Sequence, residues 1–154
     1  MTKLATLLVL VVVAVSTDRG QAAELTSIRL ISITTSERSN DVPPKGVSVG
    51  DSEFSTSRLL NAVPQFGKAK GAVVGSDQST TTLRSASTAR VEGVTRLPGG
   101  TLLIYGAVRF IAHGQIFPID GGTGAFAGAH GAVTVSPLGK DARRALNVYR
   151  LAYR

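Results

Sequence analysis

Hydrophobic and polar residues alternate with a period of two along much of the chain after residue 24. Short alternating runs rich in Val, Ile, Thr and Tyr, bounded by Gly, Pro and Asn, are typical of β-strands. The pattern predicts eight strands, over residues 28–35, 51–60, 66–75, 80–94, 101–110, 115–120, 130–135 and 144–153. A helix is the main alternative for the last of these segments, residues 144–153. Its alternation, two tyrosines and a valine favour a strand.

Turn residues separate the predicted strands at short intervals. The strongest turn signal is Pro98-Gly99-Gly100, which predicts a tight hairpin. Eight strands with short connections in about 130 residues predict an all-β domain, either an antiparallel barrel or a sandwich. The interior of an eight-stranded barrel is wide enough for packed side chains or for one small ligand.

The first 23 residues do not follow this pattern. Lys3 precedes an uncharged apolar run over residues 4–15, and Gly20-Gln21-Ala22 fits the small-x-small rule for cleavage. A run of 12 residues is too short to span a bilayer, which needs about 20. We therefore expect a signal peptide over residues 1–23, a mature domain over residues 24–154, and a secreted, periplasmic or cell-envelope location without stable membrane insertion. An uncleaved N-terminal anchor is the alternative.

Composition narrows the chemistry of the domain. The 154 residues include no cysteine, which excludes disulfides and a thiol nucleophile, and only two histidines, which argues against a metal site. The net charge is +7, but the basic residues are scattered and aromatic residues make up only 5%. Proteins that bind nucleic acid usually carry a dense basic stripe. We therefore expect a solvated basic surface and no nucleic-acid partner.

Glycines are concentrated in the second half of the chain. Gly122, Gly124 and Ala127 have the spacing of a dinucleotide-binding fingerprint, which must follow a buried strand and open a helix. Pro118 interrupts the preceding strand, and later glycines disfavour the helix. We therefore expect no nucleotide or other cofactor. Residues 120–124 are instead predicted to form a turn, and Gly128 and Gly131 to allow close backbone approach.

The same region carries a family resemblance. GTLLIYG over residues 100–106 and FPIDGGTGAFAGAHGAVTV over residues 117–135 resemble the allene oxide cyclase and dirigent superfamily. Shorter pieces at residues 49–51 and 66–71 follow the family's order, so the resemblance spans roughly residues 28–153. It implies an eight-stranded antiparallel barrel with a pocket at one end, and assembly as a homotrimer or homodimer.

The residues that carry out the cyclase reaction in the family are not present at the aligned positions of this sequence. Plant allene oxide cyclases use a glutamate on the first strand and a cysteine on the third. Alignment of Glu37 and Arg38 with the family's Glu-Arg pair puts Thr34 at the glutamate, and alignment of residues 67–71 puts Val73 at the cysteine. We therefore assign no catalytic residue and expect isomerase-like or cyclase-like activity at most. A shifted register that brings Glu37 into the site is the alternative.

Five residues are candidates for ligand binding. Thr34 and Ser57 align with the family's pocket positions, and Tyr105, Asn147 and Tyr149 are polar-tipped residues on strands that should line a barrel. Packing in the barrel core is an equally good explanation for the tyrosines.

Two functions from different classes follow. One is a barrel that binds a small apolar or phenolic ligand and steers its cyclisation, isomerisation or coupling. The other is a non-catalytic envelope or extracellular protein with a filled barrel. The interior volume discriminates between them, because an open pocket of at least about 300 Å³ favours the ligand.

Overall fold

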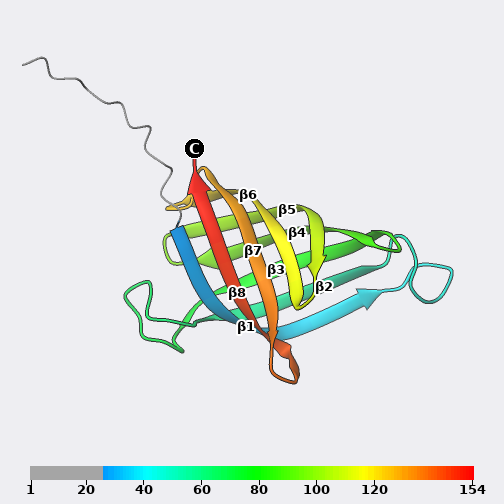
Figure 1. Cartoon of the computed structure of the whole chain (residues 1–154), viewed down its shortest axis with the longest axis horizontal. Helices are drawn as coiled ribbons and strands as arrows, with labels where there is room; N and C mark the ends of the chain where they lie inside the picture. Colours follow the sequence, from blue (N-terminus) through cyan, green and yellow to red (C-terminus); the bar gives the residue numbers. More distant parts are fainter. Residues whose placement is uncertain (1–25) are drawn as a thin grey trace, which may run out of the picture.

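The computed structural model describes residues 26–154, and the expected signal peptide over residues 1–23 lies outside them. The described chain is a closed barrel in which each strand pairs antiparallel with its neighbours in sequence and the last strand pairs with the first (Figure 1). The strands are β1 (Thr26–Asn40), β2 (Ser52–Asn61), β3 (Val73–Ser85), β4 (Thr88–Leu97), β5 (Gly100–Ile111), β6 (Gly114–Gly124), β7 (Ala129–Leu138) and β8 (Asp141–Tyr153). The all-β, eight-stranded antiparallel barrel is confirmed. No helix in this part of the chain is long and apolar enough to cross a membrane.

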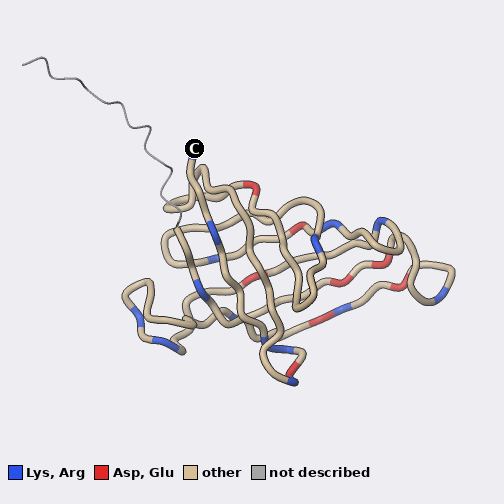
Figure 2. Tube along the Cα trace, viewed as in Figure 1, with Lys and Arg blue, Asp and Glu red and all other residues tan. Residues whose placement is uncertain are grey.

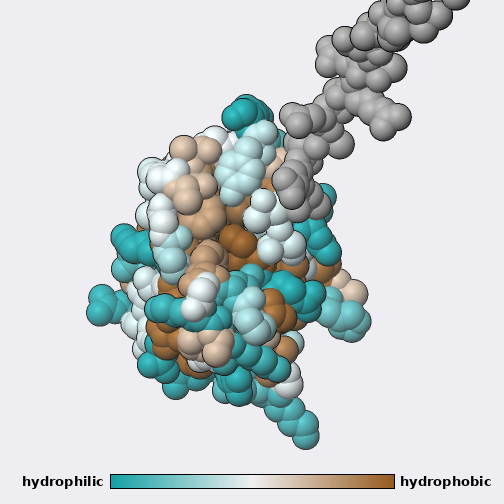
Figure 3. All heavy atoms as spheres, turned by 90° about the vertical axis from the view of Figure 1, so that its left-hand side faces the viewer, coloured by the Kyte–Doolittle hydropathy of each residue, from teal (hydrophilic) through white to brown (hydrophobic). Residues whose placement is uncertain are grey.

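Apolar side chains fill one half of the barrel. Leu30, Leu59, Leu102 and Leu151 have no exposed surface, and Phe126 covers them from the turn between β6 and β7. This half includes the start of β1 and the end of β8, and apolar side chains show between hydrophilic ones when the molecule is seen from this end (Figure 3). The apolar core therefore closes one end of the barrel, and other residues line the opposite end.

Two of the predicted strands, over residues 80–94 and 66–75, are wrong. Residues 80–94 do not form one strand, because the chain turns at residues 86–87 between β3 and β4. Residues 66–72 belong to the loop between β2 and β3. The buried Asn61 holds this loop, since its amide donates hydrogen bonds to the carbonyl oxygens of Gln65 at 2.7 Å and Lys68 at 3.0 Å. Residues 66–72 were expected to pair as a strand, but the Asn61 side chain binds the backbone of this loop instead.

The glycine-rich segment is also placed differently from the prediction. Residues 120–124 lie in β6, where Gly122 pairs with Leu102, and the turn follows at residues 125–128. A Cβ atom on Gly122 would collide with backbone atoms of Thr101 and Phe126, so the segment needs glycine for close approach. The same holds at Gly131, which lies against the Arg150 carbonyl, as expected. Because β6 leads into a turn and another strand, the segment lacks the helix of a dinucleotide fingerprint.

The hairpin at Pro98 is confirmed. β4 ends at Leu97 and β5 begins at Gly100, and Gly99 between them has a φ of 93°. Proline followed by a residue with positive φ matches a type II turn.

Candidate functional site

A cavity of about 380 Å³ occupies the open half of the barrel. It begins where the leucine core ends, and small polar residues replace leucine at the inward positions. Along β2 the inward series runs from Leu59 through Ser57 and Ser55 to Glu53. A serine side chain is much smaller than a leucine side chain, so these substitutions leave the interior unfilled. All eight strands contribute to the wall.

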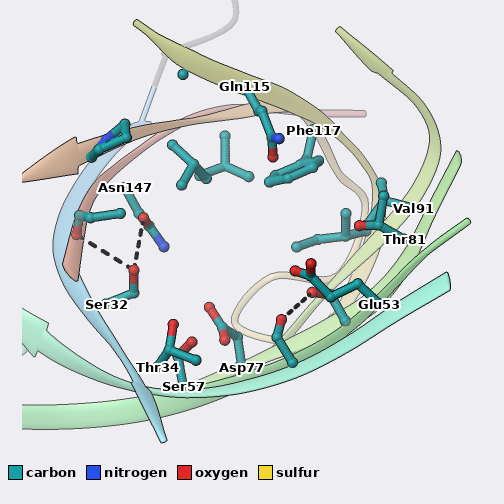
Figure 4. A pocket seen from close by; sticks show the side chains of 18 of the residues that line it. Ser32, Thr34, Glu53, Ser57, Asp77, Thr81, Val91, Gln115, Phe117 and Asn147 are labelled. Carbon is teal, nitrogen blue, oxygen red and sulfur yellow. Dashed lines mark hydrogen bonds between the residues drawn. The ribbon is translucent and has the colours of Figure 1, made fainter. Parts of the chain in front are cut away.

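The wall of the cavity has two chemically different sides, which face each other in Figure 4. Strands β1 to β3 give a polar side formed by Ser32, Thr34, Ser55, Ser57, Asp77, Ser79 and Thr81. Strands β4 to β7 give an apolar side formed mainly by Val91, Ile104, Phe117, Val133 and Val135. A ligand with one polar edge and one apolar face would therefore be held in one orientation.

Tyr149 and Asn147 form the floor from β8. Tyr149 is 1% exposed, and its hydroxyl lies 3.5 Å from the hydroxyl of the fully buried Thr95. Asn147 Oδ1 accepts a hydrogen bond of 3.2 Å from Ser32 Oγ on β1. Burial and the nearby Asp77 carboxylate raise the pKa of Tyr149 above its ordinary value. The phenol therefore stays neutral at physiological pH and can donate a hydrogen bond.

Asp77 is the carboxylate of the polar side. It lies on β3 opposite Ser57 of β2. Burial raises the pKa of Asp77 to about 6, and hydrogen bonding to Ser57 opposes this shift. A carboxyl with such a pKa exchanges protons near neutral pH, as a general base or acid requires. Asp77 was not predicted as a site residue, because residues 76–79 fall between the predicted strands 66–75 and 80–94. The alternation of Asp77, Ser79 and Thr81 was the signal that could have found it.

A pair of glutamates lies at the mouth. Glu53 on β2 lines the cavity, and its pKa is raised by burial, by the charge of Glu37 and by a hydrogen bond with Glu37. The register of β1 against β2 shifts between Thr34 and Ser36, which pairs Glu37 with the inward-facing Ser55. This β-bulge places Glu37 beside Glu53 at the rim, and Glu37 is not among the residues that line the cavity.

The mouth also has a basic side. Basic residues lie at the turn between β7 and β8 and in the first residues of β8 (Figure 2), where Arg143 and Arg144 line the cavity. Among residues 26–154 no three His, Cys, Asp or Glu side chains come together as a candidate metal site.

The structure brings four of the five candidate ligand-binding residues together. Thr34, Ser57, Asn147 and Tyr149 all line the cavity. Tyr105 does not, and its assignment to the barrel interior is wrong. It is 46% exposed on the outer face, where its ring stacks under the Arg90 guanidinium with the Arg90 Cζ atom 4.2 Å from the ring centre.

Strand alternation explains the position of Tyr105. Leu102 and Ile104 of β5 are buried inside, so residues 103 and 105 must point out. Val73, which aligned with the family's cysteine, is 48% exposed at the start of β3 and does not line the cavity. Thr34 lies in the cavity, so only the first of the two aligned reactive positions belongs to the site.

Solved structures share this barrel at low sequence identity. A pyocyanin demethylase matches with a TM-score of 0.67 and 19% identity, over 81% of this chain and 99% of that chain. The Diels–Alderase AbmU from Streptomyces koyangensis matches with a TM-score of 0.63 and 20% identity, over 88% and 71%. The pterocarpan synthase dirigent protein GePTS1 matches with a TM-score of 0.59 and 16% identity, over 85% and 86%. These matches establish a common fold.

Sequence comparison identifies the family directly. No curated protein matches the chain in sequence. The family model of dirigent-like proteins matches residues 21–152, which include every strand of the barrel except the last residue of β8. The fold, the cavity at one end and this match agree, and the chain belongs to the dirigent-like protein family.

Proposed function

We propose that this protein is a secreted barrel that binds a small apolar or phenolic molecule in its open half and steers the cyclisation, isomerisation or coupling of that molecule. The observation that carries the proposal is the cavity of about 380 Å³ with one polar and one apolar side. Its volume lies in the range of small-molecule pockets. The filled-barrel alternative requires apolar side chains throughout the interior, and only the other half of the barrel meets that condition.

The arrangement favours control by orientation. An aromatic or polyene face would pack on Val91, Ile104 and Phe117, while a hydroxyl or carbonyl would meet the polar side. Holding one conformer close to the geometry of ring closure removes much of the entropic barrier of such a reaction. The names of two solved neighbours, a Diels–Alderase and a pterocarpan synthase dirigent protein, support ring formation as a use of this fold.

The site also offers an acid–base pair. Asp77 is mostly ionised at pH 7 and can accept a proton from a phenol or from an acidic carbon. Tyr149, neutral and buried, can donate a hydrogen bond to a developing oxyanion. If Asp77 then returns the proton to another atom of the same molecule, the net result is an isomerisation or ring closure. Asp77 and Tyr149 lie outside positions 34 and 73, which align with the family's glutamate and cysteine.

Blocking the cavity tests this proposal. Ser79→Phe puts a large side chain into the open volume, whereas Thr80→Phe puts the same side chain on the outer face of the same strand. We expect 2-naphthol, a fluorescent phenol, to bind the wild type and Thr80→Phe with equal affinity, and Ser79→Phe at least tenfold more weakly. Equal binding by all three proteins would show that the cavity is not the ligand site.

The natural ligand and its fate require a second measurement. Mass spectrometry of small molecules that co-purify with the mature protein would identify the ligand class. Turnover of that molecule by the wild type, lost in Asp77→Asn, would support catalysis. Binding without turnover would support the non-catalytic alternative.

A further inference from the structure

A second hollow adjoins the cavity at its mouth. It has a volume of about 340 Å³ and lies between the loop over residues 41–51, the end of β3, the start of β4 and the end of β5. Its apolar lining comes from Val47, Leu83, Ala89 and Phe110. The function proposed above does not use this hollow, which we call the rim groove.

The rim groove is continuous with the cavity. Glu53, Thr81 and Phe110 line both hollows. Glu53 and Thr81 are partners on the adjacent strands β2 and β3, so they mark the point where the two spaces join. A molecule that extends beyond the cavity in this direction would enter the groove.

The outer wall of the groove is held in place. The Asp51 carboxylate accepts hydrogen bonds from the backbone N–H groups of Val42 at 2.9 Å and Ser48 at 2.8 Å. Leu83 links the loop to β3, because its N–H donates to the backbone carbonyl of Asp51 at 2.8 Å and its own carbonyl accepts from the Gly50 N–H at 2.9 Å. These bonds fix the loop before any ligand arrives, so little conformational entropy would be lost on binding.

Apolar side chains at this mouth are unusually open to solvent. Val47 is 86% exposed and Phe110 53% exposed, and Ile111 beside Phe110 is 44% exposed and lines the cavity. Contiguous exposed apolar surface next to a pocket is typical of ligand-binding grooves. An apolar group laid against Val47 and Phe110 would remove this surface from water.

We propose that the ligand is an elongated two-part molecule, with a phenolic or other hydroxyl-bearing head beside Asp77 and Ser57 and an apolar tail in the rim groove. This inference rests on the proposed function and adds the length and polarity of the substrate. Thr81 lies four residues along β3 from Asp77, which is about 13 Å, and Leu83 lies six residues along, which is about 20 Å. The ligand is therefore roughly 15–20 Å long, as in two linked ring systems or a ring with an alkyl or prenyl chain.

A series of 4-alkylphenols from ethyl to nonyl tests the proposal by calorimetry. The longest member spans the distance from Asp77 to the groove. For the wild type we expect affinity to keep rising from pentyl to nonyl, by about three- to fourfold for each buried methylene. Val47→Asp should stop this rise, so that 4-nonylphenol binds at least tenfold more weakly while 4-ethylphenol binds as to the wild type.

Val49→Asp is the matched control. Val49 lies in the same loop and is 63% exposed, but it lines neither hollow. We expect this variant to follow the wild type along the whole series. Equal loss of 4-nonylphenol binding in both variants, or no loss in Val47→Asp, would overturn the groove while leaving the cavity proposal intact. Failure of 4-ethylphenol to bind the wild type would overturn both proposals.

Discussion

Asp77 and Ser57 face each other across β2 and β3, and both side chains point into the cavity (Figure 4). Hydrogen bonding to Ser57 stabilises the charged form of Asp77, but burial has the larger effect and raises its pKa to about 6. The protein therefore keeps a carboxylate in a site where ionisation is unfavourable. Such a group lowers stability and is typical of functional sites.

Asp77 should make stability depend on pH. Its pKa is about 6 in the folded state against 3.8 for the unfolded reference, so the folded protein binds more protons between these values. The free energy of unfolding should therefore fall as pH rises from about 4 to about 6, by roughly 2–3 kcal/mol. Asp77→Asn should remove this fall and unfold at higher urea than the wild type at pH 7.

Asp120→Asn is the control for this measurement. Asp120 is exposed on β6, so the same replacement of a carboxylate by an amide should leave the pH dependence unchanged. Urea titrations at pH 4 and pH 7 give the comparison. A wild-type protein that is equally stable or more stable at pH 7 than at pH 4, with no change in Asp77→Asn, would contradict the assigned role of burial.

The Tyr149 hydroxyl should contribute to ligand binding. Tyr149→Phe keeps the buried ring but removes the donor, so packing is preserved and a ligand hydroxyl or carbonyl loses one hydrogen bond. We expect the affinity for 2-naphthol to fall by about 1–2 kcal/mol, or roughly 5- to 30-fold. Tyr153→Phe is the control, because Tyr153 packs at the filled end. Unchanged affinity in both variants would leave Tyr149 with a packing role alone.

The two halves of the barrel should respond differently to loss of volume. Leu102→Ala removes a side chain with no exposed surface from the leucine core and should lower the free energy of unfolding by about 2–5 kcal/mol. Leu103→Ala, one residue further along β5, removes a side chain that is 43% exposed and should change stability by less than about 0.5 kcal/mol. Chemical denaturation measures both values. Similar losses in the two variants would argue against the inward and outward assignment of β5.

Export should remove the leader. The apolar run over residues 4–15 is too short to remain in a bilayer, so the intact mass of the exported protein should correspond to a start at Ala23 or Glu24. Full-length chain in the membrane fraction would show that the segment is an anchor instead.

The strands are well predicted from the sequence because strand alternation depends on local spacing. Alternation alone left open a barrel or a sandwich, and the family resemblance implied the barrel. Strand number and the Pro98-Gly99 turn depend on residue types that act within a few positions. One error came where a distant contact decides the structure. Residues 120–124 read as a turn in isolation, but pairing with β5 keeps them extended.

The candidate site was harder to predict, because a cavity depends on volume that several strands leave unfilled together. Ser55, Ser57 and Ser79 are ordinary strand residues in sequence, and only their convergence in the barrel creates the space. Asp77 was missed because residues 76–79 fall between two predicted strands. Tyr105 was misassigned because a tyrosine fits either face of a strand, and only its neighbours Leu102 and Ile104 determine which face is inside.

The pairing of β1 with β8 has a consequence for how the protein folds. Ser32 and Asn147, which meet at the cavity floor, are 115 residues apart in the chain. Bringing such distant segments together costs loop-closure entropy, and high contact order slows folding. The pairing of β1 with β8, which completes the binding site, therefore requires the end of the chain. A nascent protein without β8 has neither a closed barrel nor a ligand pocket. A ligand that binds only the finished site would report the last step of folding.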